Sequence, residues 1–505
     1  MAIPQITADE RSSCTARIAE ALSTVRRELG EDTVQIVSGQ IDEGAAPHIE
    51  SVRRENVGMY RPRFVHGVIK PASVKDVARV LEIFDDPGLE CGLQAVSTGR
   101  NWGLGSREPA RDHAVTLDLG GLDEVRALDL DKGWAIVEPG VTQGRLAALL
   151  SGTSRMLNVT ASSAHTSVVG NGLDRGVGLR RQRVDDIVGL EVVLPGGETV
   201  HVGWWPEQDR ATPVYAHGLG PSLLPLFLQS DLGVVTAAAV RLLPRPEAQR
   251  VLRLAFGRDD LAAAVDTMRR WTAQGLVGGV LKVYDLVSAE FYGGRVGEFL
   301  AHVCVDGTER SADAVAEVIA EEAVASGLFT EVALADTDAA PDDVVARMVR
   351  GAYAGDPGGN DAMLHATVGQ PAEHVDDKGL GWLFFLPLVP FDGESVALAH
   401  HLLARIHDET GVRAGCTVNA LSSDVIDFVV SVKFQRDTDG TERAHRALDR
   451  AYELFAEAGF IPYRLDVDHA DWVDRLSPDP AARALARRLK GALDPNGAIA
   501  PGRYA

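Results

Sequence analysis

The sequence predicts an α+β protein that is built from two kinds of region. Between about residues 68 and 244, short apolar runs alternate with glycine-rich turns and a few helical segments, which indicates a mixed α/β region. After Pro246 the order strand, helix, strand occurs twice, which predicts an antiparallel sheet with helices on one face. The tail ALDPNGAIAPGRYA is rich in turn-forming residues but keeps apolar ones, so we expect it to dock on the first region.

The first region begins with a predicted helix over residues 9–29, because Ile18, Leu22 and Val25 recur at helical spacing. Two further helices are predicted over residues 73–84 and 142–150. The predicted strands are CGLQAVSTG (91–99), AVTLDLG (114–120), WAIVEPG (134–140), VGLEVVLPGGETVHVG (188–203) and LGVVTAAAVRLLP (232–244).

The second region repeats one order of elements. Its first round has a strand at RVLRLAFG, a helix over 259–275 with an acidic first turn, and a strand at VGGVLKVYDL. Its second round has a strand over 381–390, a helix over 395–411 and strands around AGCTVNAL and VIDFVVSVKF, followed by a helix over 442–459. The stretch 335–380 is rich in Asp, Gly and Pro, and we predict that it is loop.

Composition limits the functional classes. A chain of 505 residues is long enough for two or more domains, and its net charge of −22 disfavours nucleic acid and anionic membranes as partners. The four cysteines lie far apart without a CxxC pair, and the three histidines of the predicted helix 395–411 lack further ligands, so we expect no metal site. No secretory signal and no apolar run of about 20 residues is present, so we expect a cytoplasmic protein.

Two glycine-rich loops contain the residues that most clearly indicate a ligand-binding site. STGRNWGLGS (97–106) follows a predicted strand, and TSVVGNGLDRGVG (166–178) lies about 70 residues further on. Small residues expose backbone N–H groups, which can form a nest for phosphate oxygens. Neither loop is a Walker A sequence or a GxGxxG motif that opens a Rossmann helix. Two such loops in one α/β region would suit a pyrophosphate held from both sides.

A series of motifs in one order adds a family resemblance. VIKPASVKDVARVLEIF, STGRNWGLG, VTLDLGGLDEV, VEPGVTQGRLAALL, SVVGNGLDRGVG, GLEVVLPGGE and LFLQSDLGVVTAAAVRLLP, with the tail LDPNGAIAPGRY, resemble the vanillyl-alcohol oxidase and p-cresol methylhydroxylase family of FAD-linked oxidases. The resemblance implies a PCMH-type FAD-binding domain of two subdomains over 1–245, completed by the tail 465–505. It also implies a substrate-binding cap domain over 246–464.

The resemblance also implies which residues hold the cofactor. His165 is a further candidate for contact with the flavin ring, and a plain loop role is the alternative. Covalent relatives attach FAD through a histidine whose equivalent falls around Asp427–Phe428, and sister families attach it near Asn101, so non-covalent FAD is implied. The implied FAD contacts are Thr98, Gly99, Arg100, Asn101, Trp102, Gly103, Ser162, Ser167, Gly170, Asn171, Gly176, Val235 and Arg503.

Tyr463 and Arg464 match the pair with which phenol-oxidising relatives hold the phenolate oxygen. A guanidinium beside a phenol hydroxyl stabilises the phenolate, which favours hydride loss at the para-carbon, and the flavin accepts the hydride. The alternative from the residues alone is a structural salt bridge between Arg464 and Asp466 or Asp468.

Three further positions bear on substrate binding and catalysis. Leu104 stands where the family has a loop tyrosine, and Ser162 stands where it has an acid beside the flavin. His469, next to Asp468, is a candidate proton acceptor, and a surface residue on a polar turn is the alternative.

The resulting hypothesis is an FAD-dependent oxidoreductase that acts on a para-substituted phenol or benzylic alcohol, with oxygen or a redox protein as electron acceptor. Two alternatives stay open: flavin chemistry on a non-phenolic substrate, such as a hydroxy acid or a biosynthetic intermediate, and a non-catalytic flavin-binding protein. The sequence leaves a homodimer open.

Overall fold

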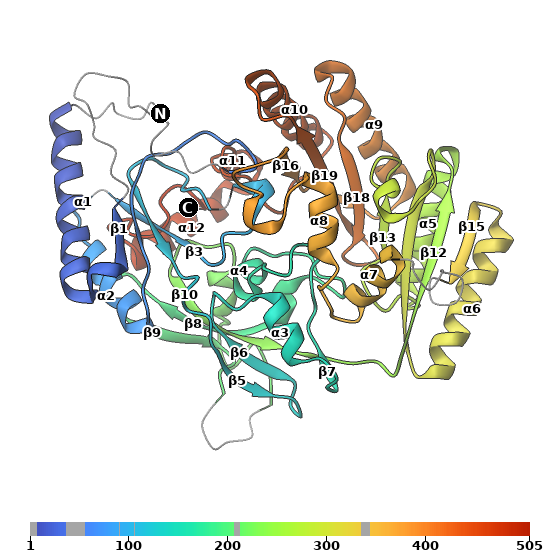
Figure 1. Ribbon diagram of the computed structural model, residues 1–505, viewed down its shortest axis with the longest axis horizontal. Coiled ribbons are helices and arrows are strands. Elements are labelled where there is room, and N and C mark those ends of the chain that lie inside the picture. Colours follow the sequence, from blue (N-terminus) through green and yellow to red (C-terminus); the bar gives the residue numbers. More distant parts are fainter. Residues whose placement is uncertain are drawn as a thin grey trace.

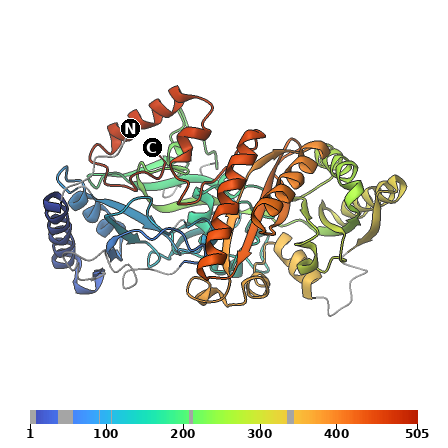
Figure 2. The ribbon, with the colours of Figure 1, turned by 90° about the horizontal axis from the view of Figure 1, so that it is seen from above.

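The computed structural model describes residues 8–36, 56–89, 91–105, 107–206, 213–334 and 344–504. It confirms the predicted α+β class, with two smaller sheets in one part of the chain and one large antiparallel sheet in the other. Figure 1 shows the first described helix, residues 8–29, and the last one, residues 480–493, beside the smaller sheets, and Figure 2 shows the large sheet and its helices beside that part. The domain limits 1–245 with 465–505, and 246–464, remain our proposal.

The first small sheet has the strand order β1-β2-β4-β3, in which β2, β4 and β3 are parallel and β1 is antiparallel to β2. The predicted N-terminal helix is present as α1, and it buries Ile18, Leu22 and Val25 against this sheet, as its helical spacing predicts. The elements are α1 (Ala8–Leu29), β1 (Val34–Ile36), β2 (Val65–Ile69), α2 (Val74–Phe84), β3 (Gly92–Val96) and β4 (Ala114–Asp118).

The second small sheet is antiparallel throughout, with the order β5-β6-β10-β8-β9. Its strands are β5 (Val125–Asp129), β6 (Trp134–Val137), β8 (Ile187–Val193), β9 (Thr199–Gly203) and β10 (Val234–Arg241). The helices α3 (Gln143–Leu149) and α4 (Val168–Leu173) precede β8, and a two-stranded ribbon joins β7 (Arg155–Met156) to β11 (Leu243–Pro244).

The tail docks on the first small sheet, as the sequence predicts. After α11 (Trp472–Leu476) and α12 (Pro480–Leu493), Ile499 forms a parallel bridge with Leu93 of β3. The Leu93 N–H donates to the Ala498 carbonyl at 2.8 Å, and the Ala500 N–H donates to the Leu93 carbonyl at 3.0 Å. The tail therefore extends the sheet from which the first glycine-rich loop emerges.

The large sheet has the order β15-β12-β14-β13-β18-β19-β16, and β17 also pairs with β19. Four helices share one apolar core with the sheet and so cover one face, as predicted. The strands are β12 (Ala248–Phe256), β13 (Lys282–Tyr284), β14 (Phe299–Gly307), β15 (Phe329–Leu334), β16 (Gly381–Phe385), β17 (Leu388–Pro390), β18 (Gly415–Ala420) and β19 (Val425–Phe434). The helices are α5 (Leu261–Ala273), α6 (Glu309–Ser326), α9 (Gly393–Thr410) and α10 (Thr438–Glu457).

Strand β19 shows how the sequence separates the two faces of this sheet. Ile426, Phe428, Val430, Val432 and Phe434 enter the core beneath the helices. The alternate residues line a cavity on the opposite face; they are Asp427, Val429, Ser431 and Lys433. Because successive strand residues point to opposite faces, this single run supplies both a core and a polar wall.

The loop prediction for 335–380 is wrong over much of its length. Residues 335–343 lie outside the described residues, but α7 (Val344–Tyr353) and α8 (Asn360–Val368) occupy much of the remainder. Val349 and Tyr353 of α7 are buried in a small cluster beneath the large sheet. The turn-forming residues Asp356, Pro357, Gly358 and Gly359 separate these two short helices and are not part of one long loop. Across the described ranges, none of the helices combines the length and apolarity needed to cross a bilayer.

Candidate active site

A cavity of about 640 Å³ lies between the two glycine-rich loops and the inner face of the large sheet. Its walls come from segments that are far apart in the sequence: the loops that follow β3 and precede α4, the strands β13, β16, β18 and β19, and the tail. The site therefore forms only when both regions and the tail pack together.

The first loop is held against the large sheet by close packing. The Tyr60 hydroxyl donates a hydrogen bond to the Gly103 carbonyl at 2.5 Å. A Cβ atom at Gly103 would lie 1.9 Å from the Phe384 ring on β16, so only glycine allows this approach. The glycine at this position therefore determines how closely the loop can approach the large sheet.

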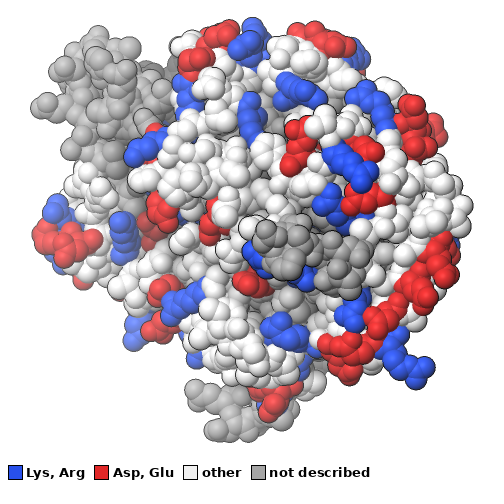
Figure 3. Space-filling model, turned by 45° about the vertical axis from the view of Figure 1, so that its right-hand side comes forward, with Lys and Arg blue, Asp and Glu red and all other residues white. Residues whose placement is uncertain are grey.

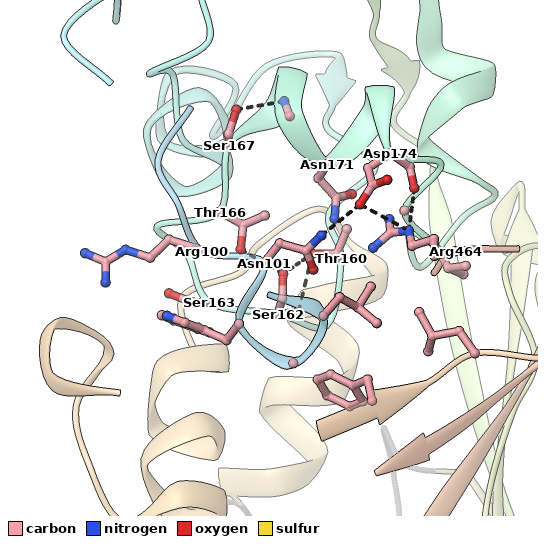
Figure 4. Close-up of a pocket in the computed structure, with 18 of the residues that line it drawn as sticks. Arg100, Asn101, Thr160, Ser162, Ser163, Thr166, Ser167, Asn171, Asp174 and Arg464 are labelled. Atoms are coloured by element: carbon pink, nitrogen blue, oxygen red, sulfur yellow. Dashed lines mark hydrogen bonds and ion pairs between the residues drawn. The ribbon is translucent and has the colours of Figure 1, made fainter. Parts of the chain in front are cut away.

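The second loop contacts the first one directly. Ser167 caps α4 by accepting a hydrogen bond from the Gly170 N–H at 2.9 Å, and its own N–H donates to the Thr98 hydroxyl at 3.2 Å. A Cβ atom at Gly170 would lie 2.4 Å from the Ser97 hydroxyl oxygen. The Asn101 amide also donates to the Asp174 carboxylate at 2.8 Å (Figure 4). The two loops thus form one wall of the cavity.

This wall has the polar groups that a nucleotide cofactor needs. The Ser162 hydroxyl is hydrogen-bonded to the hydroxyls of Thr160, at 2.5 Å, and Thr166, at 2.8 Å, and all three residues line the cavity (Figure 4). Asn171 Oδ1 is buried and has no hydrogen-bond partner within the described residues. An orphaned buried acceptor and glycines in close contact fit a bound group with phosphates and polar ring edges.

Arg464 lies at the same cavity, and its pairing differs from the salt bridges considered from the sequence. Its Nε donates to the Asp174 carbonyl and lies 3.7 Å from the Asp174 carboxylate (Figure 4). Asp468 instead pairs with Arg63 at 2.6 Å, and Asp466 pairs with His469 at 2.9 Å. The Arg464 side chain is only 7% exposed, and its Nη2 has no hydrogen-bond partner among the residues described.

Tyr463 lines the cavity beside Arg464. Its carbonyl accepts a hydrogen bond from the Gln229 side chain at 2.9 Å, which fixes the backbone of the pair. Burial, followed by the charge of Asp427, raises the pKa of the Tyr463 hydroxyl well above its usual value. Tyr463 is therefore a neutral hydrogen-bond donor at the cavity.

Three polar residues of the large sheet complete the site. In the sheet register Lys282 of β13 is opposite Asn419 of β18, and Asn419 is opposite Asp427 of β19. The Lys282 ammonium donates to Asn419 Oδ1, and the Asn419 amide donates to Asp427 at 3.3 Å. Burial raises the pKa of Asp427 to about 7 and lowers that of Lys282 to about 8. Both groups therefore change charge close to neutral pH.

The structure brings most of the predicted site residues to this one cavity. His165 does not line it; its side chain is 51% exposed and lies 3.7 Å from Glu373. The predicted residues that line the cavity are Thr98, Gly99, Arg100, Asn101, Trp102, Gly103, Leu104, Ser162, Ser167, Gly170, Asn171, Gly176, Val235, Tyr463, Arg464 and Arg503.

His469 also lies away from the cavity lining. Its ring stacks on Tyr452 with 3.8 Å between the ring centroids, and its Nδ1 lies 2.9 Å from Asp466. Burial opposes protonation, but the carboxylates of Asp449 and Asp466 raise the pKa of His469 to about 9. A protonated imidazole that two carboxylates hold in place is a structural ion pair, and it is poorly suited to accept a proton from a substrate.

Sequence reasoning missed the polar wall of the large sheet. Lys282, Asn419 and Asp427 each belong to a different strand, so only the sheet register brings them together. The available signal was the alternation in VIDFVVSVKF, where polar residues interrupt an apolar strand on one face. Asp174 and Tyr504 also line the cavity and lie outside the predicted set.

Comparison with known proteins agrees with this geometry. Residues 65–203 match the family model described as FAD binding domain. The chain is 28% identical to 1'-carboxy-chondrochloren decarboxylase of Chondromyces crocatus, over 87% of this chain and 90% of that protein. It is 24% identical to the 4-cresol dehydrogenase [hydroxylating] flavoprotein subunit of Pseudomonas putida, over 96% of this chain and 95% of that protein.

Two solved structures share the fold over almost the whole chain. Substrate-bound p-cresol methylhydroxylase superposes with a TM-score of 0.83 at 22% identity, covering 99% of this chain and 97% of that one. The 4-ethylphenol oxidase of Gulosibacter chungangensis, in its isoeugenol complex, gives a TM-score of 0.83 at 21% identity, covering 100% of this chain and 98% of that one.

Proposed function

We propose that this chain is an FAD-linked oxidoreductase of the vanillyl-alcohol oxidase and p-cresol methylhydroxylase family and that it oxidises a para-substituted phenol or benzylic alcohol. The observation that carries the proposal is the pair Tyr463 and Arg464. Both line the cavity, and a buried nitrogen of Arg464 has no hydrogen-bond partner among the described residues. A buried guanidinium with an unused donor suits a phenolate oxygen.

The two glycine-rich loops would hold the cofactor. Thr98 to Gly103 and Ser167 to Asn171 line the cavity, and Gly176, Val235 and Arg503 line it nearby. Bound there, FAD supplies the two-electron acceptor for the reaction. No histidine of the described residues lines the cavity, so we propose that the FAD is held without a histidyl bond.

Arg464, Tyr463 and Asp427 of β19 would bind the phenol and accept its proton. Arg464 stabilises the phenolate, and Tyr463 donates a hydrogen bond to the same oxygen. Asp427 lies beside the Tyr463 hydroxyl, and its pKa of about 7, raised by burial, suits a group that accepts a proton near neutral pH. We propose that Asp427 supplies the carboxylate that the sequence lacks at Ser162.

A second candidate reaction is oxidation of a phenol that also loses a carboxylate. The relative from Chondromyces crocatus is named as a decarboxylase. In such a reaction the carbon attached to the ring would give a hydride to bound FAD, and the bond between the neighbouring carbon and the carboxylate would then break. Its electron pair forms a new double bond and CO₂ is released. The buried cation Lys282 on the cavity wall favours a substrate with an anionic group.

Anaerobic flavin reduction tests the proposal. The holoprotein is mixed with 4-ethylphenol, 4-hydroxybenzyl alcohol, their methyl ethers and a set of 2-hydroxy acids, and the flavin absorbance is followed. We expect the phenols to bleach the flavin and the methyl ethers, which cannot form a phenolate, to react far more slowly. Bleaching by a hydroxy acid but by none of the phenols would instead support the non-phenolic alternative. CO₂ release from a carboxylated phenol would distinguish the second candidate.

A further inference from the structure

A row of five polar residues crosses the large sheet. Arg253 of β12 is opposite His302 of β14, His302 is opposite Lys282, Lys282 is opposite Asn419, and Asn419 is opposite Asp427. Directly opposite residues of antiparallel strands share a face of the sheet. From His302 to Asp427 each of these residues is at most 7% exposed, so this part of the row is buried.

The charges along the row leave Lys282 without a counter-ion. Arg253 pairs with Glu331 at 2.9 Å. Burial, assisted by Arg253 and Lys282, lowers the pKa of His302 to about 3, so its imidazole is neutral. On its other side Lys282 donates to the neutral amide of Asn419. In the described parts of the chain, no carboxylate forms an ion pair with Lys282. The nearby charge of Asp427, which is hydrogen-bonded to Asn419, only acts to raise the pKa of Lys282.

A buried ammonium group without an ion pair is costly, and this one lines a cavity. The cost shows in the pKa of Lys282, which burial lowers to about 8 although the charge of Asp427 acts in the opposite direction. An anion that entered the cavity next to Lys282 would offset this cost. The arrangement therefore favours an anionic ligand at this position.

The charge of the cavity contrasts with that of the whole chain. The chain has 72 acidic and 50 basic residues, and Figure 3 shows an extended band of acidic side chains toward the right-hand edge of one face. The described cavity lining has two acidic residues, Asp174 and Asp427. Its seven basic residues are Arg100, Arg107, Lys282, Arg413, Lys433, Arg464 and Arg503.

The cofactor does not account for Lys282. The glycine-rich loops proposed for the pyrophosphate form one wall of the cavity, whereas Lys282 belongs to a strand of the opposite wall. Lys282 and Asp427 are separated by the single strand β18, which corresponds to roughly 10 Å across the sheet. Asp427 lies beside Tyr463, so this is also the scale of the distance from the proposed phenol site to Lys282.

We propose that Lys282, held by Asn419, binds a carboxylate on the side chain of the substrate, which is then a phenol with a short anionic para-chain. The proposal rests on the proposed function, because Tyr463 and Arg464 hold the phenolic end. Two buried cations at opposite ends of the substrate would fix its orientation. A neutral phenol of the same size would gain only one of these two contacts.

A matched pair of ligands tests the proposal on the holoenzyme. 3-(4-Hydroxyphenyl)propanoate and its amide have almost the same shape and differ in charge. 3-Phenylpropanoate lacks the phenol and keeps the carboxylate. Dissociation constants are measured by anaerobic calorimetry with wild-type protein and with Lys282→Met, which replaces a buried cation by an apolar chain of similar length. The flavin spectrum and the melting temperature of the variant report its folding.

We expect the wild type to bind the acid at least tenfold more tightly than the amide, because removing one partner of a buried charge pair is costly. Lys282→Met should abolish this preference and leave the affinity for the amide almost unchanged. Lys433→Met is the matched control, because Lys433 lines the same cavity six residues beyond Asp427 on β19, and its variant should keep the preference.

Two results would overturn the proposal: equal or absent binding of acid and amide by the wild type, or a preference that survives in Lys282→Met. The comparison of acid and amide needs only the wild type, so a poorly folded variant does not block the test. If 3-phenylpropanoate binds as well as the phenolic acid and its binding still needs Lys282, the carboxylate site stands and the phenol proposal fails.

Discussion

Replacing Arg464 by alanine should slow flavin reduction by a phenol roughly 30-fold or more. The side chain is 7% exposed, so the phenolate that it stabilises would lose its cation in a largely desolvated site. Removing one partner of such a pair costs about 2–5 kcal/mol. Each ~1.4 kcal/mol of lost transition-state stabilisation is a factor of ten in rate. Arg464→Lys keeps the charge but not the planar fork of donors, so its rate of flavin reduction should lie between those of the wild type and Arg464→Ala.

Stopped-flow reduction under anaerobic conditions measures this rate, and a melting curve runs beside it. Arg464 also donates to the Asp174 carbonyl, so some loss of thermal stability is expected from the same change. The Asn101 amide still holds the Asp174 carboxylate at 2.8 Å, so the loops should stay together and flavin should be retained. If Arg464→Ala melts earlier yet is reduced by the phenol at the wild-type rate, the residue is a structural partner and the phenolate reasoning is refuted.

Three further predictions concern the cofactor and the proton. Gly170→Val should abolish FAD retention, because its Cβ would lie 2.4 Å from the Ser97 hydroxyl oxygen; a normal ratio of flavin to protein absorbance after purification would contradict this. Acid precipitation should release the FAD into the supernatant, and a yellow pellet would show a covalent bond. Asp427→Asn should remove one pH dependence of the folding stability. Burial raises the pKa of Asp427 in the folded state from 3.8 to about 7. The stability that the protonated carboxyl contributes is therefore lost as pH rises from about 4 through 7. The melting temperature of the variant relative to wild type should therefore rise over that range, and an unchanged difference would argue against a buried, titrating carboxyl.

The sequence predicted the helices and strands that follow from a local pattern of apolar residues. Helical spacing of Ile18, Leu22 and Val25 was enough for α1, and the alternation of β19 was enough for a strand. The prediction failed for α7, because its ten residues lie among dense turn formers and gain their stability from burying Val349 and Tyr353 against distant strands.

The site was predicted only in part for the same reason. The glycine-rich loops could be identified because their chemistry is contiguous in sequence. The partner of Arg464 could not be identified in this way. The sequence suggested Asp466 and Asp468 because they are close to Arg464 along the chain, whereas Asp174 is 290 residues away and contacts Arg464 only in the folded protein. The row from Arg253 to Asp427 depends on strand register, which no local pattern specifies.

The bridge between Leu93 and Ile499 has a consequence for how the protein matures. Arg503 and Tyr504 line the same cavity as the loop that follows β3, so one wall of this cavity comes from a segment that is made long after that loop. The sheets of the first region can fold during synthesis, since regions generally fold as they emerge. The pocket cannot enclose its cofactor until residues 494–504 have left the ribosome. The FAD that we propose for this cavity can therefore be enclosed only after the tail has been synthesised and has docked beside β3.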